Sequence, residues 1–356
     1  MGLFVVRTAV PGIPLVLPVN EVAAMVLVVL AVFRRPTRSL SSVSWFLPLC
    51  ALLLGFLVVE SIVNDVPLVK RAGSIAILML LALFIAGGRI DVVSGLKGLA
   101  VALALNIGLF YLGIAPNQYG GVLTGFLQDK NAAGLYYAVV PLLFLVIVSR
   151  PWHRVAVIAL ACLAVVLTDS RTSMAAMACA LIWLVVGGRF GKVFKVGLGV
   201  ALYLAFQYVN DNFSQIGRYS DRFGSDALRG RIDAAAEAKA AATAWYGSGL
   251  GEATVTSQGL EWFFHNSYLA LWVEGGVVML VAVLAMYLLG GFGWFTGRPA
   301  TRASGCVEAA TVALLLCATR IGEAFLTSPG FLIIGVGLAL TAHGAAAAGV
   351  TRGRLG

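Results

Sequence analysis

The stretch VSWFLPLCALLLGFLVVESIV, residues 43–63, carries a single charged side chain, Glu60. A helix needs about 20 predominantly apolar residues to cross the hydrocarbon core of a bilayer, and this run meets that length. Comparable apolar runs recur from one end of the chain to the other. The sequence therefore predicts a protein that crosses a membrane many times.

The apolar runs predict eleven membrane-spanning helices. They lie at residues 17–33, 43–63, 72–88, 99–115, 132–148, 155–168, 172–187, 196–209, 266–290, 305–319 and 327–348. The segment 3–16 is apolar but is interrupted by Arg7, Pro11 and Pro14, so it is either an interfacial hairpin or a twelfth span. The start of the chain lacks the charged region and small-residue cleavage site of a secretory signal peptide, so we expect the first helices to insert the chain.

The predicted fold is an all-α, polytopic membrane bundle of about 11–12 helices with one long outer loop that contains short helices. We divide it into N-terminal transmembrane helices over residues 1–209, the loop 210–264, and C-terminal transmembrane helices over residues 265–356, all within a single membrane domain.

The composition of the whole chain excludes several other classes of protein. Of 356 residues, 60% are hydrophobic and 12% are charged, and the mean hydropathy is +0.94. Soluble domains carry about 25% charged residues, so an ordinary soluble enzyme and a disordered chain are excluded. The five cysteines are scattered in or beside the spans, and the chain has three histidines. We therefore expect no disulfide framework, no metal site and no cofactor.

The net charge of +9 orients the predicted helices. Cytoplasmic loops of membrane proteins collect Lys and Arg. One set of short connections holds fourteen basic residues, and the opposite set holds six, with five more in the long loop 210–262. The first set is predicted to be cytoplasmic, which puts the long loop on the outer face. Because most of the excess charge follows this rule, it does not indicate a nucleic-acid partner. The fourteen are Arg34, Arg35, Arg38, Arg89, Lys97, Arg150, Arg154, Arg189, Lys192, Lys195, Arg298, Arg302, Arg352 and Arg354.

The long loop contains an alanine-rich stretch, Asp226 to Tyr246, that is predicted to be helical. Neighbours on a helix lie three and four residues apart. Arg229 therefore has Asp226 and Asp233 beside it and can be neutralised locally. Arg231 has no acid at these spacings. Its side chain either extends toward water or holds an anion, because the planar donors of arginine suit phosphate.

Two other features of this loop are weaker candidates. Arg218 and Arg222 form a second basic patch that is either solvated or part of a binding surface. Gly247-Ser248-Gly249-Leu250-Gly251 follows a helix, whereas the dinucleotide-binding fingerprint follows a strand. We interpret the glycines as a tight turn close to the membrane surface.

His265-Asn266-Ser267-Tyr268 stands where the loop re-enters the membrane. The pKa range of histidine suits proton transfer, and its ring can also bond to phosphate. A straight helix places Glu274 about 13 Å deeper than His265 and on the opposite side. Glu274 is a functional candidate as an intramembrane acid, although a structural role that ties helices together is the preferred interpretation.

Three further outer turns carry charge. They are Asp129-Lys130-Asn131, Asp169-Ser170-Arg171-Thr172-Ser173, and the pair Arg320 and Glu323, which we expect to bind each other. Basic or imidazole side chains thus gather at one membrane depth. The chemistry that fits is recognition of an anionic headgroup, with Arg and Lys at a diphosphate and His or an acid activating a hydroxyl.

These residues resemble the bacterial O-antigen ligase and O-antigen polymerase superfamily of membrane glycosyltransferases. The resemblance covers roughly residues 20–345 and rests on the order of loose motifs. They are Gly125-Phe126 through Asp129-Lys130-Asn131 to Gly134; Asp169-Ser170-Arg171-Thr172; Gly230-Arg231 with Trp245 and the glycine cluster; and His265-Asn266 with Glu274-Gly275.

The resemblance implies transfer of a glycan from undecaprenyl diphosphate to an acceptor, without a metal, at the outer face of the bacterial cytoplasmic (inner) membrane. It gives His265, Arg171 and Arg231 catalytic roles, with the histidine as a base or a phosphate ligand. We add Lys130, Asn131, Arg222, Arg229, Asn266 and Tyr268 as candidate substrate-binding residues. The acceptor is lipid A-core, a growing polysaccharide or another surface glycan. Gly276 fits the spacing of the ligases and Met279 does not, so both ligase and polymerase stay open.

Two alternatives come from other classes. A transporter or flippase for an anionic or lipid-linked solute predicts charges along a path through the bilayer, and Glu274 and Glu308 are the acids that lie noticeably within spans. A structural subunit without chemistry leaves the outer cluster unexplained. The sequence does not define an oligomeric state.

Overall fold

The computed structural model of the chain describes residues 18–212 and 223–353. The segment 3–16 and the basic patch Arg218 and Arg222, singled out in the sequence, lie outside the described residues. Within the described ranges the chain forms twelve α-helices and a two-stranded hairpin. They are α1 (Val19–Val32), α2 (Phe46–Val63), α3 (Val69–Ala86), α4 (Val92–Tyr111), α5 (Lys130–Phe144), α6 (Pro151–Leu167), α7 (Arg171–Val186), α8 (Lys192–Asn212), α9 (Phe223–Ala242), β1 (Thr254–Ser257), β2 (Leu260–Phe263), α10 (Ser267–Met286), α11 (Arg302–Ala318) and α12 (Ser328–Gly353).

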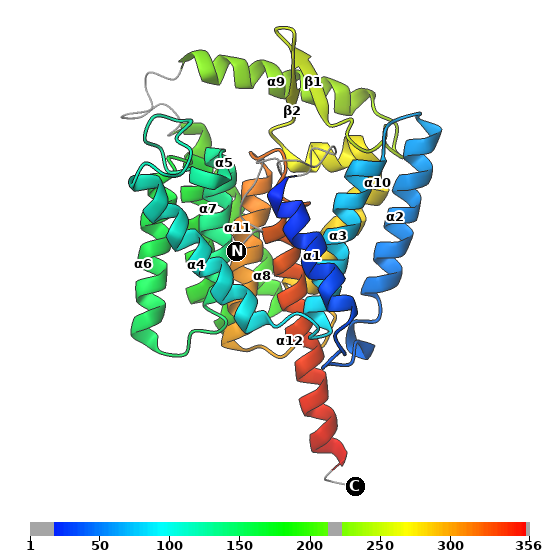
Figure 1. Ribbon diagram of the computed structural model, residues 1–356, viewed down its shortest axis with the longest axis vertical. Helices are drawn as coiled ribbons and strands as arrows, with labels where there is room; N and C mark the ends of the chain where they lie inside the picture. Colours follow the sequence, from blue (N-terminus) through cyan, green and yellow to red (C-terminus); the bar gives the residue numbers. More distant parts are fainter. Residues whose placement is uncertain (1–17, 213–222, 354–356) are drawn as a thin grey trace.

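The predicted all-α membrane bundle is confirmed. Eleven of the described helices coincide with the eleven predicted spans, and α9 lies across one end of the bundle (Figure 1). Six helices, namely α2, α3, α4, α7, α8 and α10, are long and apolar enough to cross a membrane. Others are shorter, and the 14 residues of α1 extend about 21 Å at 1.5 Å per residue.

Consecutive spans alternate in direction, so their connections fall at two opposite ends. The connections after α1, α3, α5, α7 and α10 lie at the end away from α9 (Figure 1). Together with the first turns of the helices that follow them, they carry most of the fourteen basic residues. Two of them are joined where the Thr37 N–H donates to the Gly87 carbonyl at 3.0 Å. We call the end that carries α9 the outer face, following the orientation predicted from charge.

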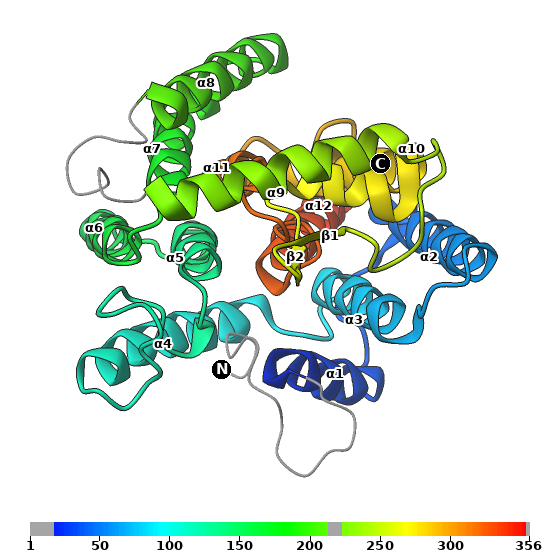
Figure 2. The same cartoon turned by 90° about the horizontal axis from the view of Figure 1, so that it is seen from above.

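The core is built around α11 and α12, which lie at the centre of the bundle (Figure 2). Helix α11 packs on α5 and α7, and α12 packs on α3. Small side chains permit these close approaches between helices. Ala309, Ala310 and Ala313 of α11 are fully buried, and a Cβ on Gly134 of α5 would lie 2.8 Å from Ser170 Cβ.

The prediction of a straight span over residues 266–290 is wrong, because α10 is kinked. Its first half runs beneath α9 along the outer face, and the helix then turns into the bundle (Figures 1 and 2). The turn occurs at Gly275 (φ −154°, ψ 24°) and Gly276, whose φ of 59° favours glycine. Glu274 therefore stays near the outer ends of α2 and α3 and does not lie about 13 Å deeper than His265.

The glycine turn after α9 fits against this kink. Ser248 N–H donates to the Val273 carbonyl at 2.7 Å, and a Cβ on Gly247 would lie 2.8 Å from Gly275 Cα. Gly247, Gly249 and Gly251 all have positive φ. The geometry agrees with the tight turn predicted from the glycine cluster.

Helix α9 covers most of the stretch predicted to be helical, Asp226 to Tyr246. It begins three residues before the start of that stretch and ends four residues before its end. Its buried face is formed by Ile232, Ala236 and Ala240, and the two alanines pack with Phe264 and Val273. Residues four apart share a face, so this face differs from the side of the helix that carries Arg231. The hairpin β1–β2 pairs Thr254 with Phe263 and returns the chain to the start of α10.

Candidate functional site

Three helices begin on the outer face beside one another, and each start is capped by a side chain. Asp129 caps α5, Ser170 caps α7, and Asn266 caps α10 by accepting from the N–H groups of Tyr268 and Leu269. A helix N-terminus carries partial positive charge, which attracts anions. The up-and-down topology therefore aims several positive helix ends at one surface of the bundle.

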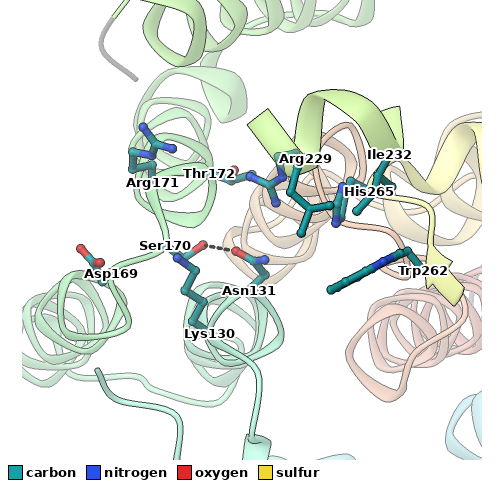
Figure 3. A pocket seen from close by; sticks show the side chains of 11 residues that line it. Lys130, Asn131, Asp169, Ser170, Arg171, Thr172, Arg229, Ile232, Trp262 and His265 are labelled. Atoms are coloured by element: carbon teal, nitrogen blue, oxygen red, sulfur yellow. Dashed lines mark hydrogen bonds between the residues drawn. The ribbon is translucent and has the colours of Figure 1, made fainter. Parts of the chain in front are cut away.

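A pocket of about 210 Å³ lies at these helix ends and beneath α9 (Figure 3). We call it the cationic pocket, because Lys130, Arg171 and Arg229 line it with a single carboxylate, Asp169. Figure 3 shows Lys130 and Arg171 on one side, His265 and Trp262 on the other, and Arg229 entering from α9. Its other lining residues are Asn131, Ser170, Thr172, Leu228 and Ile232. Ser170 Oγ donates to Asn131 Oδ1 at 3.4 Å, which joins the starts of α7 and α5.

His265 is held by an acid from α9. Its Nδ1 lies 3.1 Å from Asp233 Oδ1, and its side chain is 26% exposed. An ionised carboxylate only accepts hydrogen bonds, so this contact assigns the proton of a neutral imidazole to Nδ1. The Nε2 atom then has a lone pair with which to accept a proton.

His265 also stands where three cavities meet. Besides the cationic pocket, it lines a cavity of about 600 Å³ between α1, α3, α5 and α12, which we call the α3 cavity. It also lines a cavity of about 630 Å³ between α8, α9, α10 and α11, which we call the α8 cavity. The α3 cavity shares Asn131 and Trp262 with the cationic pocket, and the α8 cavity shares Arg229. His265 is thus accessible from the cationic pocket and from two further cavities.

The structure gathers most of the residues singled out in the sequence. Arg171, Lys130, Asn131, Arg229 and His265 line the cationic pocket. The candidates next to the histidine, Asn266 and Tyr268, line the α8 cavity.

Arg231 has a different position. It is exposed on α9, and it does not line any of these three cavities. Arg222 belongs to the part of the chain that the structure does not describe. Of the two neighbouring arginines on α9, Arg229 is the one at the pocket.

Several residues at the site were not identified from the sequence. Trp262 lines both the cationic pocket and the α3 cavity, and Asp233 was assigned to Arg229 by helical spacing. The aromatic run that ends at His265 was a visible signal for Trp262. No local pattern connects Asp233 with His265, because the hairpin between them sets their distance.

Arg71 was also missed, and it connects the start of α3 with α10 and with the turn between α11 and α12. Its Nη2 lies 3.1 Å from Glu274 Oε2, and its Nη1 contacts Glu323. Glu274 Oε1 accepts a further bond from Gly251 N–H at 3.2 Å. The preferred interpretation of Glu274 as a structural tie agrees with this geometry.

The predicted pair of Arg320 with Glu323 is wrong. Arg320 Nη2 lies 2.8 Å from Asp211 Oδ1 of α8, whereas Glu323 turns to Arg71 of α3. Arg320 and Glu323 are three positions apart, but the turn between α11 and α12 is not helical, so the helical spacing rule does not apply.

The described residues contain no group of three or more His, Cys, Asp and Glu side chains that could hold a metal ion. What they do offer is a concentration of cations and helix N-termini around one histidine and its acid. Such a site suits an anionic substrate, and the protein is a multi-pass membrane protein with this site at one end of the bundle.

The family comparison agrees with this class of site. Residues 155–284 match the family model for O-antigen ligases, a range that runs from α6 into α10 and includes Arg171, α9 and His265. The match supports the resemblance to the O-antigen ligase and polymerase superfamily, and with it an enzyme of the glycosyltransferase type. No curated protein matches the chain significantly.

Proposed function

We propose that the protein transfers a glycan from undecaprenyl diphosphate to a hydroxyl group of an acceptor at the outer face of the bacterial cytoplasmic membrane. The observation that carries this proposal is the cationic pocket, which three basic side chains line together with His265, and His265 also lines two other cavities. The family match supports the reaction class.

The diphosphate of the donor fits the cationic pocket. Arg171 and Arg229 offer planar pairs of donors to phosphate oxygens, and Lys130 adds a compact charge. The N-termini of α5 and α7 add partial positive charge at the same point. Arg231 is included because it belongs to the motif Gly230-Arg231 of the resemblance. We assign it contacts with the donor on the solvent side of α9.

The lipid part of the donor suits the α3 cavity. That cavity shares Asn131, Trp262 and His265 with the cationic pocket, so a bound molecule can extend from one into the other. Its walls include Ile75, Leu78 and Leu135 from α3 and α5. Burial of a prenyl chain against such side chains is favourable by about 25 cal/mol per Å².

In the proposed reaction, the oxygen of the acceptor hydroxyl forms a bond to the anomeric carbon of the donor glycan. The bond between that carbon and the phosphate oxygen breaks, and undecaprenyl diphosphate leaves with the electron pair. His265 Nε2 takes the proton of the acceptor hydroxyl, and the Asp233 carboxylate stabilises the resulting imidazolium. Arg171, Arg229 and Lys130 stabilise the charge on the leaving diphosphate.

The two acids that a transporter would need within its spans, Glu274 and Glu308, are both engaged in structural contacts. A proton or ion path needs titratable groups along the bilayer. Glu274 is paired with Arg71, and Glu308 lies 2.7 Å from Lys195 Nζ and accepts a bond from Trp183. Both acids tie helices together.

The test uses purified protein in detergent with a glycan carried on undecaprenyl diphosphate, and it measures release of undecaprenyl diphosphate and glycan transfer together. Arg171→Ala is expected to slow transfer by about 10²–10³-fold, and His265→Ala by about 10²–10⁴-fold. Lys70→Ala is the matched control, because Lys70 is an exposed basic residue at the outer start of α3 that does not line these cavities. Full transfer by Arg171→Ala and His265→Ala would refute the proposal.

A further inference from the structure

The α8 cavity is chemically unlike the cationic pocket, although the two share Arg229 and His265. The cationic pocket combines three basic side chains with one acid. The α8 cavity combines Arg229 and Arg320 with two acids, Asp233 and Glu237. Arg320 is already paired with Asp211 at 2.8 Å. The α8 cavity therefore has no excess of positive charge to offer a phosphate.

Besides His265 and the Thr319 hydroxyl, the remaining polar groups of the α8 cavity are amides and phenols. Gln207 Nε2 donates to Tyr203 Oη at 2.9 Å, so the hydroxyl hydrogen of Tyr203 can be donated to another group. Asn266 uses its Oδ1 to cap α10, which leaves its Nδ2 as a donor. Tyr268 offers its ring, because its hydroxyl donates to the Leu315 carbonyl at 3.0 Å. Carboxylates, amides and aromatic rings together suit a sugar with several hydroxyl groups.

Asp233 links the α8 cavity to His265, which is the base in the proposed reaction. Its carboxylate lines the α8 cavity and also contacts His265 Nδ1. A hydroxyl group bound in the α8 cavity therefore lies beside the imidazole that the proposed reaction uses as its base. The donor approaches the same ring from the cationic pocket on the other side.

We propose that the α8 cavity binds the acceptor, and that the acceptor sugar at this position is an uncharged, hydroxyl-bearing sugar without phosphate. This inference rests on the proposed glycosyl transfer and adds the place and chemical class of the second substrate. Glu237 determines part of the specificity, because a phosphate ester beside Glu237 and Asp233 meets like charge.

The test measures acceptor KM, donor KM and kcat separately. The acceptor probe is the surface oligosaccharide of the producing cell, used before and after its phosphate esters are removed with aqueous hydrofluoric acid. The wild-type protein is expected to use the dephosphorylated form with the higher kcat/KM. Glu237→Lys is expected to raise the KM for the dephosphorylated acceptor about fivefold. It is also expected to lower the ratio of kcat/KM between the dephosphorylated and phosphorylated acceptors about fivefold, with donor KM unchanged.

Glu261→Gln is the matched control, because Glu261 is an exposed acid on β2 that does not line the three cavities. Glu237→Gln separates loss of charge from reversal of charge at an exposed position where folding is not at risk. A raised donor KM with unchanged acceptor KM would assign the α8 cavity to the donor instead. A preference of the wild-type protein for the phosphorylated form would overturn the proposed sugar class.

These outcomes differ from failure of the proposed function itself. If the protein is not a glycosyltransferase of lipid-linked donors, the wild type releases no undecaprenyl diphosphate with either acceptor, and Arg171→Ala changes nothing. If only the acceptor assignment is wrong, transfer occurs and depends on Arg171, but it does not respond to Glu237.

Discussion

Asp233 and His265 are 32 positions apart in the sequence and meet because the hairpin β1–β2 folds back beside α9. In the proposed reaction Asp233 is a positioning residue. It keeps the proton on Nδ1 and so leaves Nε2 as the base. Its carboxylate also favours the imidazolium that forms when the acceptor loses its proton.

We expect Asp233→Asn to lower kcat by about 10- to 100-fold. This effect is smaller than that of removing the His265 imidazole, because a general base contributes about 10²–10⁴-fold to the rate. The amide keeps the size of the side chain but removes its charge. Donor KM and acceptor KM are expected to change less than twofold. Steady-state kinetics with each substrate varied in turn measures this split, and Asp233→Glu is expected to restore part of kcat. An equal fall for Asn and Glu would assign Asp233 a purely structural role.

The sequence identified the types of residue at the site more completely than their partners. Lys130, Asn131, Arg171 and His265 were found because cations and histidine are unexpected on the outer face. Helical spacing assigned Asp233 to Arg229, and the same reasoning favoured Arg231. Spacing describes neighbours on one helix, whereas the buried face of α9 depends on Phe264 and Val273, which arrive from elsewhere in the chain. The role of Arg231 stays a prediction from the motif.

Helix α10 is the element whose shape most affects the site. Its kink at Gly275 and Gly276 keeps the segment after His265 on the outer face. A Cβ on Gly276 would overlap the carbonyl oxygen of Trp245 and would also require a left-handed φ of 59°. Two glycines in an apolar run are compatible with a straight helix, so the sequence alone predicted a straight span.

We expect Gly276→Ala to destabilise the protein by more than the roughly 1 kcal/mol of left-handed strain, because backbone atoms of the turn after α9 must also move. Thermal unfolding of the purified protein, followed by tryptophan fluorescence, measures the change. Gly98→Ala in α4 is the control, since no atom lies within 4 Å of its added Cβ, and a helical alanine is expected to be neutral or stabilising. Equal melting temperatures for Gly276→Ala and wild type would contradict the geometry.

The pair Arg71–Glu274 ties α3 to α10 at this kink. Glu274 is 1% exposed and Arg71 is 21% exposed, so removing one partner leaves the other charge largely buried. Arg71→Gln is expected to cost about 3 kcal/mol. The double variant Arg71→Gln/Glu274→Gln is expected to cost less than the sum of the two single variants. Unfolding free energies of the four proteins measure the coupling, and additive costs would show that the contact contributes nothing.

At the scale of the whole molecule, two independent charge patterns bear on orientation. The short loops at the end away from α9 hold most of the basic residues, which the positive-inside rule assigns to the cytoplasm. At the other end, α5, α7 and α10 begin, and their positive helix termini face the cationic pocket. The sequence predicted the spans and their sidedness because apolar length and loop charge are local properties. It could not predict that three outer helix starts share one pocket, since that depends on how the helices pack.

The orientation is tested with one cysteine on each side. Thr256→Cys lies on the exposed hairpin of the outer face, and Ser39→Cys lies on the exposed connection between α1 and α2. A membrane-impermeant maleimide is expected to label Thr256→Cys in intact cells and Ser39→Cys only after permeabilisation. The wild type is the control, because Cys50, Cys179, Cys306 and Cys317 are buried and Cys162 lies within α6. Labelling of Ser39→Cys in intact cells would invert the topology and move the cationic pocket to the cytoplasmic side, where a donor displayed on the outer leaflet could not reach it.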